Sequence, residues 1–140
     1  MKNHSDSLLV KFGGKTGEGI DSTGEMLGYI AKESGLHVNT FRTFPSVIVG
    51  GRTAYEVHMA ARPVLARGDE VHILVAFDQD SMDRLSGETA QGALVLYDGD
   101  QVQEIPSLGY GVQWVDVPLQ KMARELGNPI VRNMIALGIV

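Results

Sequence analysis

The residues best suited to chemistry lie in a glycine-rich segment near the N-terminus, GGKTGEG at 13–19. The segment follows a short apolar run and precedes a helical pattern, an arrangement that presents backbone N–H groups and a positive helix dipole to an anion such as phosphate. Lys15, Thr16 and Ser22 add side-chain donors. Glu18 opposes this interpretation, because a carboxylate repels a phosphate unless it points away. We therefore expect an anion-binding loop, with a simple tight turn as the alternative.

Neither of two common phosphate-binding motifs describes this loop. The Walker pattern GxxxxGK[ST] would require a glycine where Leu9 stands. The dinucleotide pattern GxGxxG is met by Gly17 and Gly19 but ends on Ser22. In dinucleotide-binding folds an acidic residue at the end of the second strand binds the ribose, whereas Arg42 stands there in this chain. An arginine suits a 2′-phosphate, so NADP stays open as a ligand.

No other residues show the spacing of a catalytic or metal centre. The 4 histidines lack metal-ligand spacing, and no Ser/His/Asp arrangement is visible. His58 and His72 lie in predicted strands, where packed or surface histidines are expected. Asp78 follows a buried strand, and we interpret it as the N-cap of the next helix rather than as a ligand. Arg42 and Arg52 are candidates for phosphate contacts or solvated surface residues. We predict no catalytic residue and no metal site.

The hydrophobic pattern sets the glycine loop between a strand at 8–12 and a helix that begins near Asp21 or Ser22 and ends at Gly35. A second strand at 37–44 completes a βαβ unit, which favours a parallel sheet. Further strands are expected at 53–59, 71–77 and 112–117, a hairpin at 93–105, and helices at 78–85, at 118–127 and from 128 onward. The predicted fold class is α/β, a single Rossmann-like domain over 1–140 with a mostly parallel sheet, flanking helices and a small hairpin.

Composition excludes several functions. The chain has 140 residues, 17 glycines and no cysteine, so it supplies no disulfide, iron–sulfur ligand or thiol nucleophile. Its net charge of −5 and lack of a basic run disfavour nucleic acid and anionic membranes as partners. No apolar stretch approaches the length of a membrane span. A cytoplasmic location is the expectation that follows.

The last predicted helix ends in an almost wholly apolar stretch, 134–140, without a capping glycine or a polar exit. Native termini are usually polar or tied down. We therefore expect a domain that is cut within a longer sequence, with an interface helix as the alternative.

Two glycine motifs, GGKTGEGIDSTGEML (13–27) and TFPSVIVGGRTAYEVHM (43–59), resemble the gamma subunit or gamma domain of 2-oxoacid:ferredoxin oxidoreductases, the pyruvate, 2-oxoglutarate and ketoisovalerate enzymes. The likeness is strongest to the gamma domain fused at the N-terminus of the alpha subunit. DEVHILVAFDQDSMDR (69–84) is similar to the central strand and following helix of that family, and GNPIVRNMIALG (127–138) to a later helix. The resemblance covers nearly the whole chain.

The resemblance implies a place in a complex that oxidatively decarboxylates a 2-oxoacid on thiamine diphosphate, passes electrons through iron–sulfur clusters to ferredoxin, and forms acyl-coenzyme A. Thiamine diphosphate and the clusters belong to the alpha and beta partners and other cysteine-bearing parts. The gamma domain would be non-catalytic, with a structural role and a contribution to coenzyme A binding. Many relatives read GxGGQG in the loop, from which Lys15, Thr16 and Glu18 depart. The candidate cofactor-binding residues are Gly14, Lys15, Thr16, Gly17, Glu18, Gly19 and Ser22.

Two other functions remain open from the sequence. One is a stand-alone α/β module that binds a nucleotide or phosphate through the glycine loop. The other is a purely structural interaction domain, in which the glycines only make a tight turn.

Overall fold

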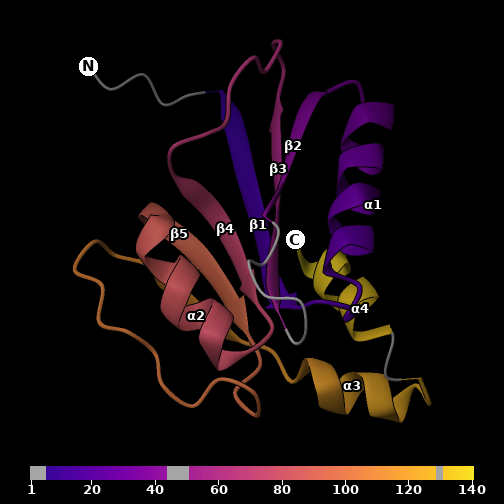
Figure 1. Ribbon diagram of the computed structural model, residues 1–140, viewed down its shortest axis with the longest axis vertical. Coiled ribbons are helices and arrows are strands. Elements are labelled where there is room, and N and C mark those ends of the chain that lie inside the picture. The colour runs from indigo at the N-terminus through magenta and orange to yellow at the C-terminus, as the bar shows by residue number, and fades with distance from the viewer. Residues whose placement is uncertain (1–5, 44–50, 129–130) are drawn as a thin grey trace.

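A six-stranded sheet with strand order β2-β3-β1-β4-β5-β6 forms the centre of the molecule (Figure 1). The computed structural model describes residues 6–43, 51–128 and 131–140. The strands are β1 (Ser7–Lys15), β2 (His37–Thr43), β3 (Arg52–Ala60), β4 (Val71–Ala76), β5 (Thr89–Tyr97) and β6 (Gln113–Asp116). The helices are α1 (Ile20–Glu33), α2 (Gln79–Leu85), the 3₁₀-helix η1 (Ser86–Glu88), α3 (Leu119–Glu125) and α4 (Arg132–Ile139).

The sheet is mixed but mostly parallel, as the sequence predicts. The β1–β4, β4–β5 and β5–β6 pairs are parallel, whereas β3 runs antiparallel to both β1 and β2. The first and second strands of the chain are therefore parallel but not adjacent, because β3 lies between them. The burial of the strands explains this order: β3 is buried on both faces and suits the interior of a sheet, whereas β2 is largely exposed and forms an edge.

Two hydrophobic cores cover the two faces of the sheet. On one face, Val10 and Phe12 of β1 are fully buried and belong to a cluster that includes Ile20 of α1. On the other face, Leu9 of β1 shares a cluster with Met82 of α2. Successive residues of β1 thus point to opposite layers, as the period of a strand requires. Figure 1 shows α1 along one side of the sheet and α2 on the other side of the view.

The first glycines of the glycine-rich segment lie in β1 rather than in a loop, which corrects the sequence prediction. Gly13 pairs with Ala54 of β3, and Gly14 with Thr53. A Cβ on Gly13 would lie 2.4 Å from a methyl group of Leu85 in α2, and one on Gly14 would lie 2.7 Å from a methyl group of Ile20. Both glycines are needed because helices press on both faces of the strand at this point.

The hairpin predicted at 93–105 is absent, since the structure gives residues 101–105 no strand. Both edges of β5 are already taken by β4 and β6, so no edge is left for a returning strand. The chain after β5 is held instead by Asp98, whose side chain accepts the N–H groups of Asp100 and Gln120. The amide oxygen of Gln79 in α2 accepts two further N–H groups of this segment.

The helix caps agree with the sequence in part. Asp78 caps α2, because its carboxylate accepts the N–H of Ser81 at 2.8 Å. Helix α1 begins earlier than predicted: Gly19 is its N-cap, with no side-chain cap, and Asp21 lies in the first turn. Gly35 follows α1 with a φ of 88°, as expected of a glycine that ends a helix. The predicted residues Pro129 and Ile130 of the last helix lie outside the described residues.

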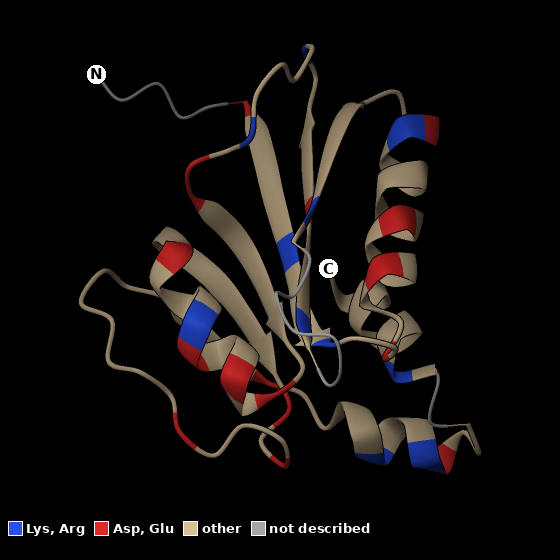
Figure 2. Cartoon of the chain, viewed as in Figure 1, with Lys and Arg blue, Asp and Glu red and all other residues tan. Residues whose placement is uncertain are grey.

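Charges are distributed unevenly over the helices. Acidic residues outnumber basic ones on α1 and α2, whereas α3 carries Lys121 and Arg124 against Glu125 (Figure 2). Among the described residues, no helix has the length and apolar character that crossing a membrane requires.

Candidate ligand site at the glycine loop

The glycine loop is the short segment between the end of β1 and the start of α1. Gly17 and Gly19 have φ angles of 89° and 79°, in the left-handed region that favours glycine. These two residues turn the chain from the strand into the helix. Because Gly19 caps α1 without a side chain, the first N–H groups of the helix have no side-chain acceptor there. A positive helix end with such N–H groups attracts an anion.

Thr16 ties this loop to the start of β3. Its backbone N–H and its hydroxyl both donate to the carbonyl oxygen of Gly51, at 3.0 and 2.8 Å. The two glycine motifs of the sequence therefore meet in space at Thr16 and Gly51. The rest of the second motif before Gly51, at 44–50, lies outside the described residues.

A pocket of about 340 Å³ opens beside the loop, near the carboxyl ends of β1 and β2. Ligands of α/β sheets commonly bind at this end of the strands. The residues that line it are Thr16, Gly17, Gly19, Ile20, Asp21, Ser22, Glu25, Arg42 and Thr53. Four of the predicted site residues are thus brought together, namely Thr16, Gly17, Gly19 and Ser22. Gly14, Lys15 and Glu18 do not line the pocket.

Sequence reasoning named Arg42 as a candidate for a phosphate contact but missed the two carboxylates of this pocket, Asp21 and Glu25. Asp21 and Arg42 form an ion pair across it, from α1 to the end of β2. Asp21 Oδ1 is buried and, among the described residues, accepts no hydrogen bond. With Glu25, the described part of the lining carries two carboxylates and one guanidinium. The signal for Arg42 was present in its place at a strand end, but its pairing with Asp21 depends on the packing of α1 beside β2.

The contacts of Glu18 are structural and join the glycine loop to helix α4. Its carboxylate accepts the backbone N–H of Lys15 at 3.1 Å and pairs with the guanidinium of Arg132 at 3.1 Å. Its backbone carbonyl accepts the side-chain amide of Asn133. The charge that seemed to oppose an anion site is therefore matched by Arg132 of α4, on the side of the loop that does not line the pocket.

The second arginine considered for phosphate binding has other partners. Arg52 donates to Asp78 at 2.9 Å and lies 3.3 Å from Asp80. The N-cap of α2 thus also fixes the first residue of β3, and the positive charge of Arg52 is balanced there.

A larger cavity, of about 740 Å³, lies at the opposite end of β1. The two strand histidines belong to its lining. Both ring nitrogens of His58 have hydrogen-bond partners, Ala66 O and Ser7 Oγ. His72 Nδ1 accepts the N–H of Leu9 at 3.0 Å, and burial lowers the pKa of His72 although nearby Glu70 opposes this. These contacts indicate that His58 and His72 have a structural role in packing the ends of the strands.

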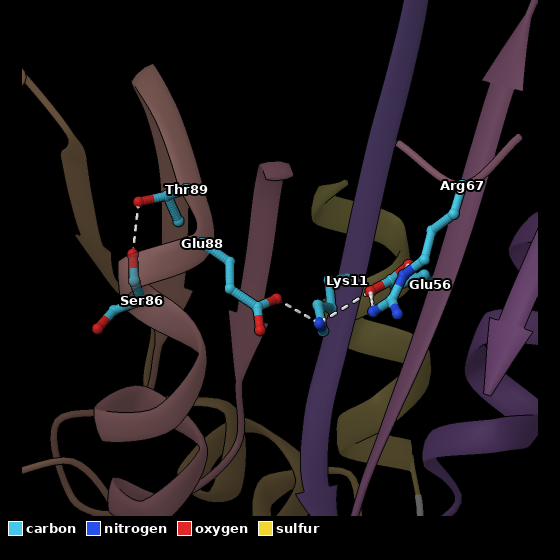
Figure 3. Close-up of polar contacts among 6 residues, drawn as sticks. All are labelled: Lys11, Glu56, Arg67, Ser86, Glu88 and Thr89. Atoms are coloured by element: carbon cyan, nitrogen blue, oxygen red, sulfur yellow. Dashed lines mark hydrogen bonds and ion pairs between the residues drawn. The ribbon is translucent and has the colours of Figure 1, made fainter. Parts of the chain in front are cut away.

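A buried ion-pair network crosses the sheet and was not expected from the sequence (Figure 3). Lys11 of β1 pairs with Glu56 of β3 at 2.8 Å, and the side chains are 2% and 3% exposed. Glu88 of η1 also pairs with Lys11, and Arg67 donates twice to Glu56. Burial would raise the pKa of Glu56, but the hydrogen bonds from Arg67 and Lys11 outweigh it and hold the pKa below 4.5. In the described part of the chain, no group of acidic or histidine side chains has the arrangement of a metal centre.

These features define an α/β domain in which a glycine loop joins a strand to a helix at the carboxyl end of a mostly parallel sheet. A family model described as pyruvate ferredoxin/flavodoxin oxidoreductase matches residues 10–140, and the chain belongs to this family. The resemblance drawn from the two glycine motifs is thereby confirmed.

Curated relatives are subunits of such oxidoreductases. Ketoisovalerate oxidoreductase subunit VorA of Methanothermobacter marburgensis is 29% identical over 134 residues, which are 95% of this chain and 28% of the relative. 2-Oxoglutarate oxidoreductase subunit KorA of Mycobacterium tuberculosis is 23% identical over 137 residues, which are 92% of this chain and 20% of the relative. The chain thus spans a minor part of the length of these relatives.

Solved structures share the fold. 2-Oxoglutarate:ferredoxin oxidoreductase from Magnetococcus marinus, with 2-oxoglutarate, coenzyme A and succinyl-CoA bound, gives a TM-score of 0.86 at 29% identity; the match covers 96% of this chain and 24% of that one. The gamma subunit of a keto/oxoacid ferredoxin oxidoreductase from Geobacter sulfurreducens gives a TM-score of 0.78 at 25% identity; 94% of this chain and 73% of that chain are covered.

Proposed function

We propose that the chain is the gamma-type domain, spanning 1–140, of a 2-oxoacid:ferredoxin oxidoreductase. In this proposal the domain is non-catalytic: it helps to assemble the complex with the alpha and beta parts and contributes to coenzyme A binding through the glycine loop. Thiamine diphosphate and the iron–sulfur clusters would be held by the partners, and ferredoxin would be reached only through them. The location that accompanies this proposal is the cytoplasm.

The observation that carries the proposal is the match of residues 10–140 to the family, together with the similarity of the fold to an isolated gamma subunit. The absence of cysteine supports a division of labour in which the clusters lie elsewhere, because cluster ligation requires thiolates. Coenzyme A is bound in one structural neighbour.

The pocket supports a contribution to coenzyme A binding rather than a complete site. Backbone N–H groups near Gly17 and Gly19 suit a phosphate oxygen. Among the described residues of the rim, however, Asp21 and Glu25 stand against one cation, Arg42, and two carboxylates weaken the attraction for a polyphosphate. We therefore expect the isolated domain to bind coenzyme A weakly, with the remaining contacts supplied by partner parts.

Calorimetric titration of the chain with coenzyme A, NADP and ATP tests this proposal. We expect heat of binding with coenzyme A and none with the other two. Binding of ATP or NADP without a response to coenzyme A would favour a stand-alone nucleotide-binding module instead. In activity assays the chain alone should not decarboxylate a 2-oxoacid, and it should co-purify with alpha and beta partners. Turnover by the chain alone would contradict a non-catalytic role.

A glycine substitution with a matched control locates the binding. Gly17→Val forces a branched side chain into a φ of 89° in the loop and is expected to reduce coenzyme A affinity at least tenfold. Gly35→Val imposes the same kind of strain at a φ of 88°, but one residue beyond the C-cap of α1, away from the pocket. For both, the added Cβ would meet nothing within 4 Å, so the two variants differ in place rather than in packing. Equal affinities for both variants and the native chain would mean that the loop is only a turn.

A further inference from the structure

Helix α4 contacts the glycine loop at Glu18, a residue that does not line the pocket. Three groups converge on Glu18: the backbone N–H of Lys15 and the guanidinium of Arg132 on its carboxylate, and the amide of Asn133 on its carbonyl. Glu18 does not line the pocket, whereas its neighbours Gly17 and Gly19 do. The contacts from α4 therefore fix the loop while they leave its ligand-facing side open.

The two residues of α4 are themselves held firmly. Asn133 is 5% exposed. The side chain of Arg132 is only 16% exposed, and its guanidinium lies 5.2 Å from the ring centroid of Phe77, which directly follows the central strand β4. A cation over an aromatic face is attracted by the ring. The contact with Phe77 thus fixes the position of the Arg132 guanidinium relative to the sheet, independently of its ion pair with Glu18.

The loop has little room to shift toward α4. A Cβ on Gly19 would lie 2.6 Å from Asn133 Nδ2, so the helix packs directly against this glycine. Thr16 holds the start of the loop through Gly51, and Glu18, between two glycines in left-handed conformations, is the residue with a side chain that can hold the rest of it. Without contacts to Glu18, the part of the loop from Gly17 to Gly19 would sample more backbone conformations, and a ligand would have to order it at a cost in affinity.

We propose that Arg132 and Asn133 are positioning residues, which act through Glu18 to hold the glycine loop in the conformation that binds its ligand. This inference rests on the proposed coenzyme A contact of the loop, but the ordering of the loop can be measured without any ligand.

The test measures two quantities on the full chain and its variants: coenzyme A affinity by calorimetry, and hydrogen exchange of the loop amides of Thr16 and Glu18, which donate to Gly51 and Lys15. Arg132→Gln should speed exchange of both amides and weaken coenzyme A binding about tenfold. Asn133→Ala should act in the same direction. Arg124→Gln, at an exposed arginine of α3, is matched in chemistry and should change neither quantity.

Two further variants separate positioning from a general loss of structure. Arg132→Lys keeps a cation near Glu18 and should restore part of the affinity. If Arg132 acts through Glu18, the double variant Glu18→Gln/Arg132→Gln should bind about as weakly as Glu18→Gln alone. Fully additive losses, or an affinity that stays at the native value in Arg132→Gln, would overturn the inference.

A failure of the proposed coenzyme A binding can be distinguished from a failure of the positioning role of Arg132 and Asn133. If the native chain gave no heat with coenzyme A, the proposed ligand of the loop would be wrong. The exchange measurement would still decide the role of α4: unchanged protection of Thr16 and Glu18 in both Arg132→Gln and Asn133→Ala would overturn it, and lost protection would support the holding contact.

Discussion

Replacing Glu56 by glutamine is expected to destabilise the fold by about 3 kcal/mol, because it removes one partner of a buried ion pair, a change that typically costs about 3–5 kcal/mol. The lower end of that range applies here. Lys11 keeps Glu88 as a partner, and Arg67, whose side chain is 51% exposed, can return to water. At about 4 °C per kcal/mol for a domain of this size, the Tm should fall by about 12 °C.

Two variants work as controls for this prediction. Glu88→Gln removes a partner that is 45% exposed, and such exposed pairs contribute about 1 kcal/mol or less. The double variant Lys11→Met/Glu56→Gln leaves no buried charge without a partner, so it should be more stable than the sum of the single effects by about 1–2 kcal/mol. Urea unfolding of the native chain, of Glu56→Gln, Lys11→Met and Glu88→Gln, and of the double variant gives the five free energies that this comparison needs. Equal losses for Glu56→Gln and Glu88→Gln would refute the reasoning from burial.

The same network predicts a dependence on pH. The pKa of Glu56 is lowered in the folded state, so protons bind the unfolded chain more readily as the pH falls below the ordinary value of 4.5. The stability that the Glu56 carboxylate contributes is therefore present above pH 4.5 and is lost as the pH falls through the folded pKa. The difference in unfolding free energy between the native chain and Glu56→Gln should shrink on acidification. A difference that stays constant would contradict the assignment.

Two further outcomes follow from close packing and from a buried histidine. Gly24→Ala should destabilise the chain by about 2 kcal/mol, because its Cβ would lie 2.1 Å from the ring of Tyr55. Gly28→Ala on the same helix meets only ordinary contacts at 3.6 Å and should be neutral or stabilising by up to about 1 kcal/mol; the same sign for both variants in thermal unfolding would argue against this packing. His72, which accepts the N–H of Leu9, has its pKa lowered by burial below 6.5, so stability should fall as the pH drops below 6.5; an NMR titration midpoint above that value would contradict this.

Apart from the hairpin at 93–105, the order of elements could be predicted from the sequence because it depends on local patterns. The apolar run before Asp78, the cap at that residue and the glycine after α1 each depend on neighbours within a few positions. The insertion of β3 between β1 and β2 could not be read in this way. Strand order depends on which strands can be buried on both faces, and Glu56 in β3 looks like a surface residue until Lys11 is placed beside it.

In the candidate site, too, local features could be predicted from the sequence, whereas contacts between distant residues could not. The glycine loop was recognisable from composition, and Thr16 and Ser22 do lie in the pocket. The Asp21–Arg42 pair depends on how α1 packs beside β2, and the Glu18–Arg132 pair joins residues from opposite ends of the chain. No local sequence pattern predicts such contacts, because they form only when the helices pack against the sheet.

The Lys11–Glu56 pair also determines which alignments of β1 and β3 are allowed. A slip of one residue would turn either side chain to the opposite face, and a slip of two would set Lys11 against Ala54 or His58. In each case two charges would stay in the interior without each other, which costs far more than mismatched apolar residues do. Apolar residues on both sides of β3 would tolerate several alignments, so this one pair of opposite charges acts as a check on correct strand pairing during folding.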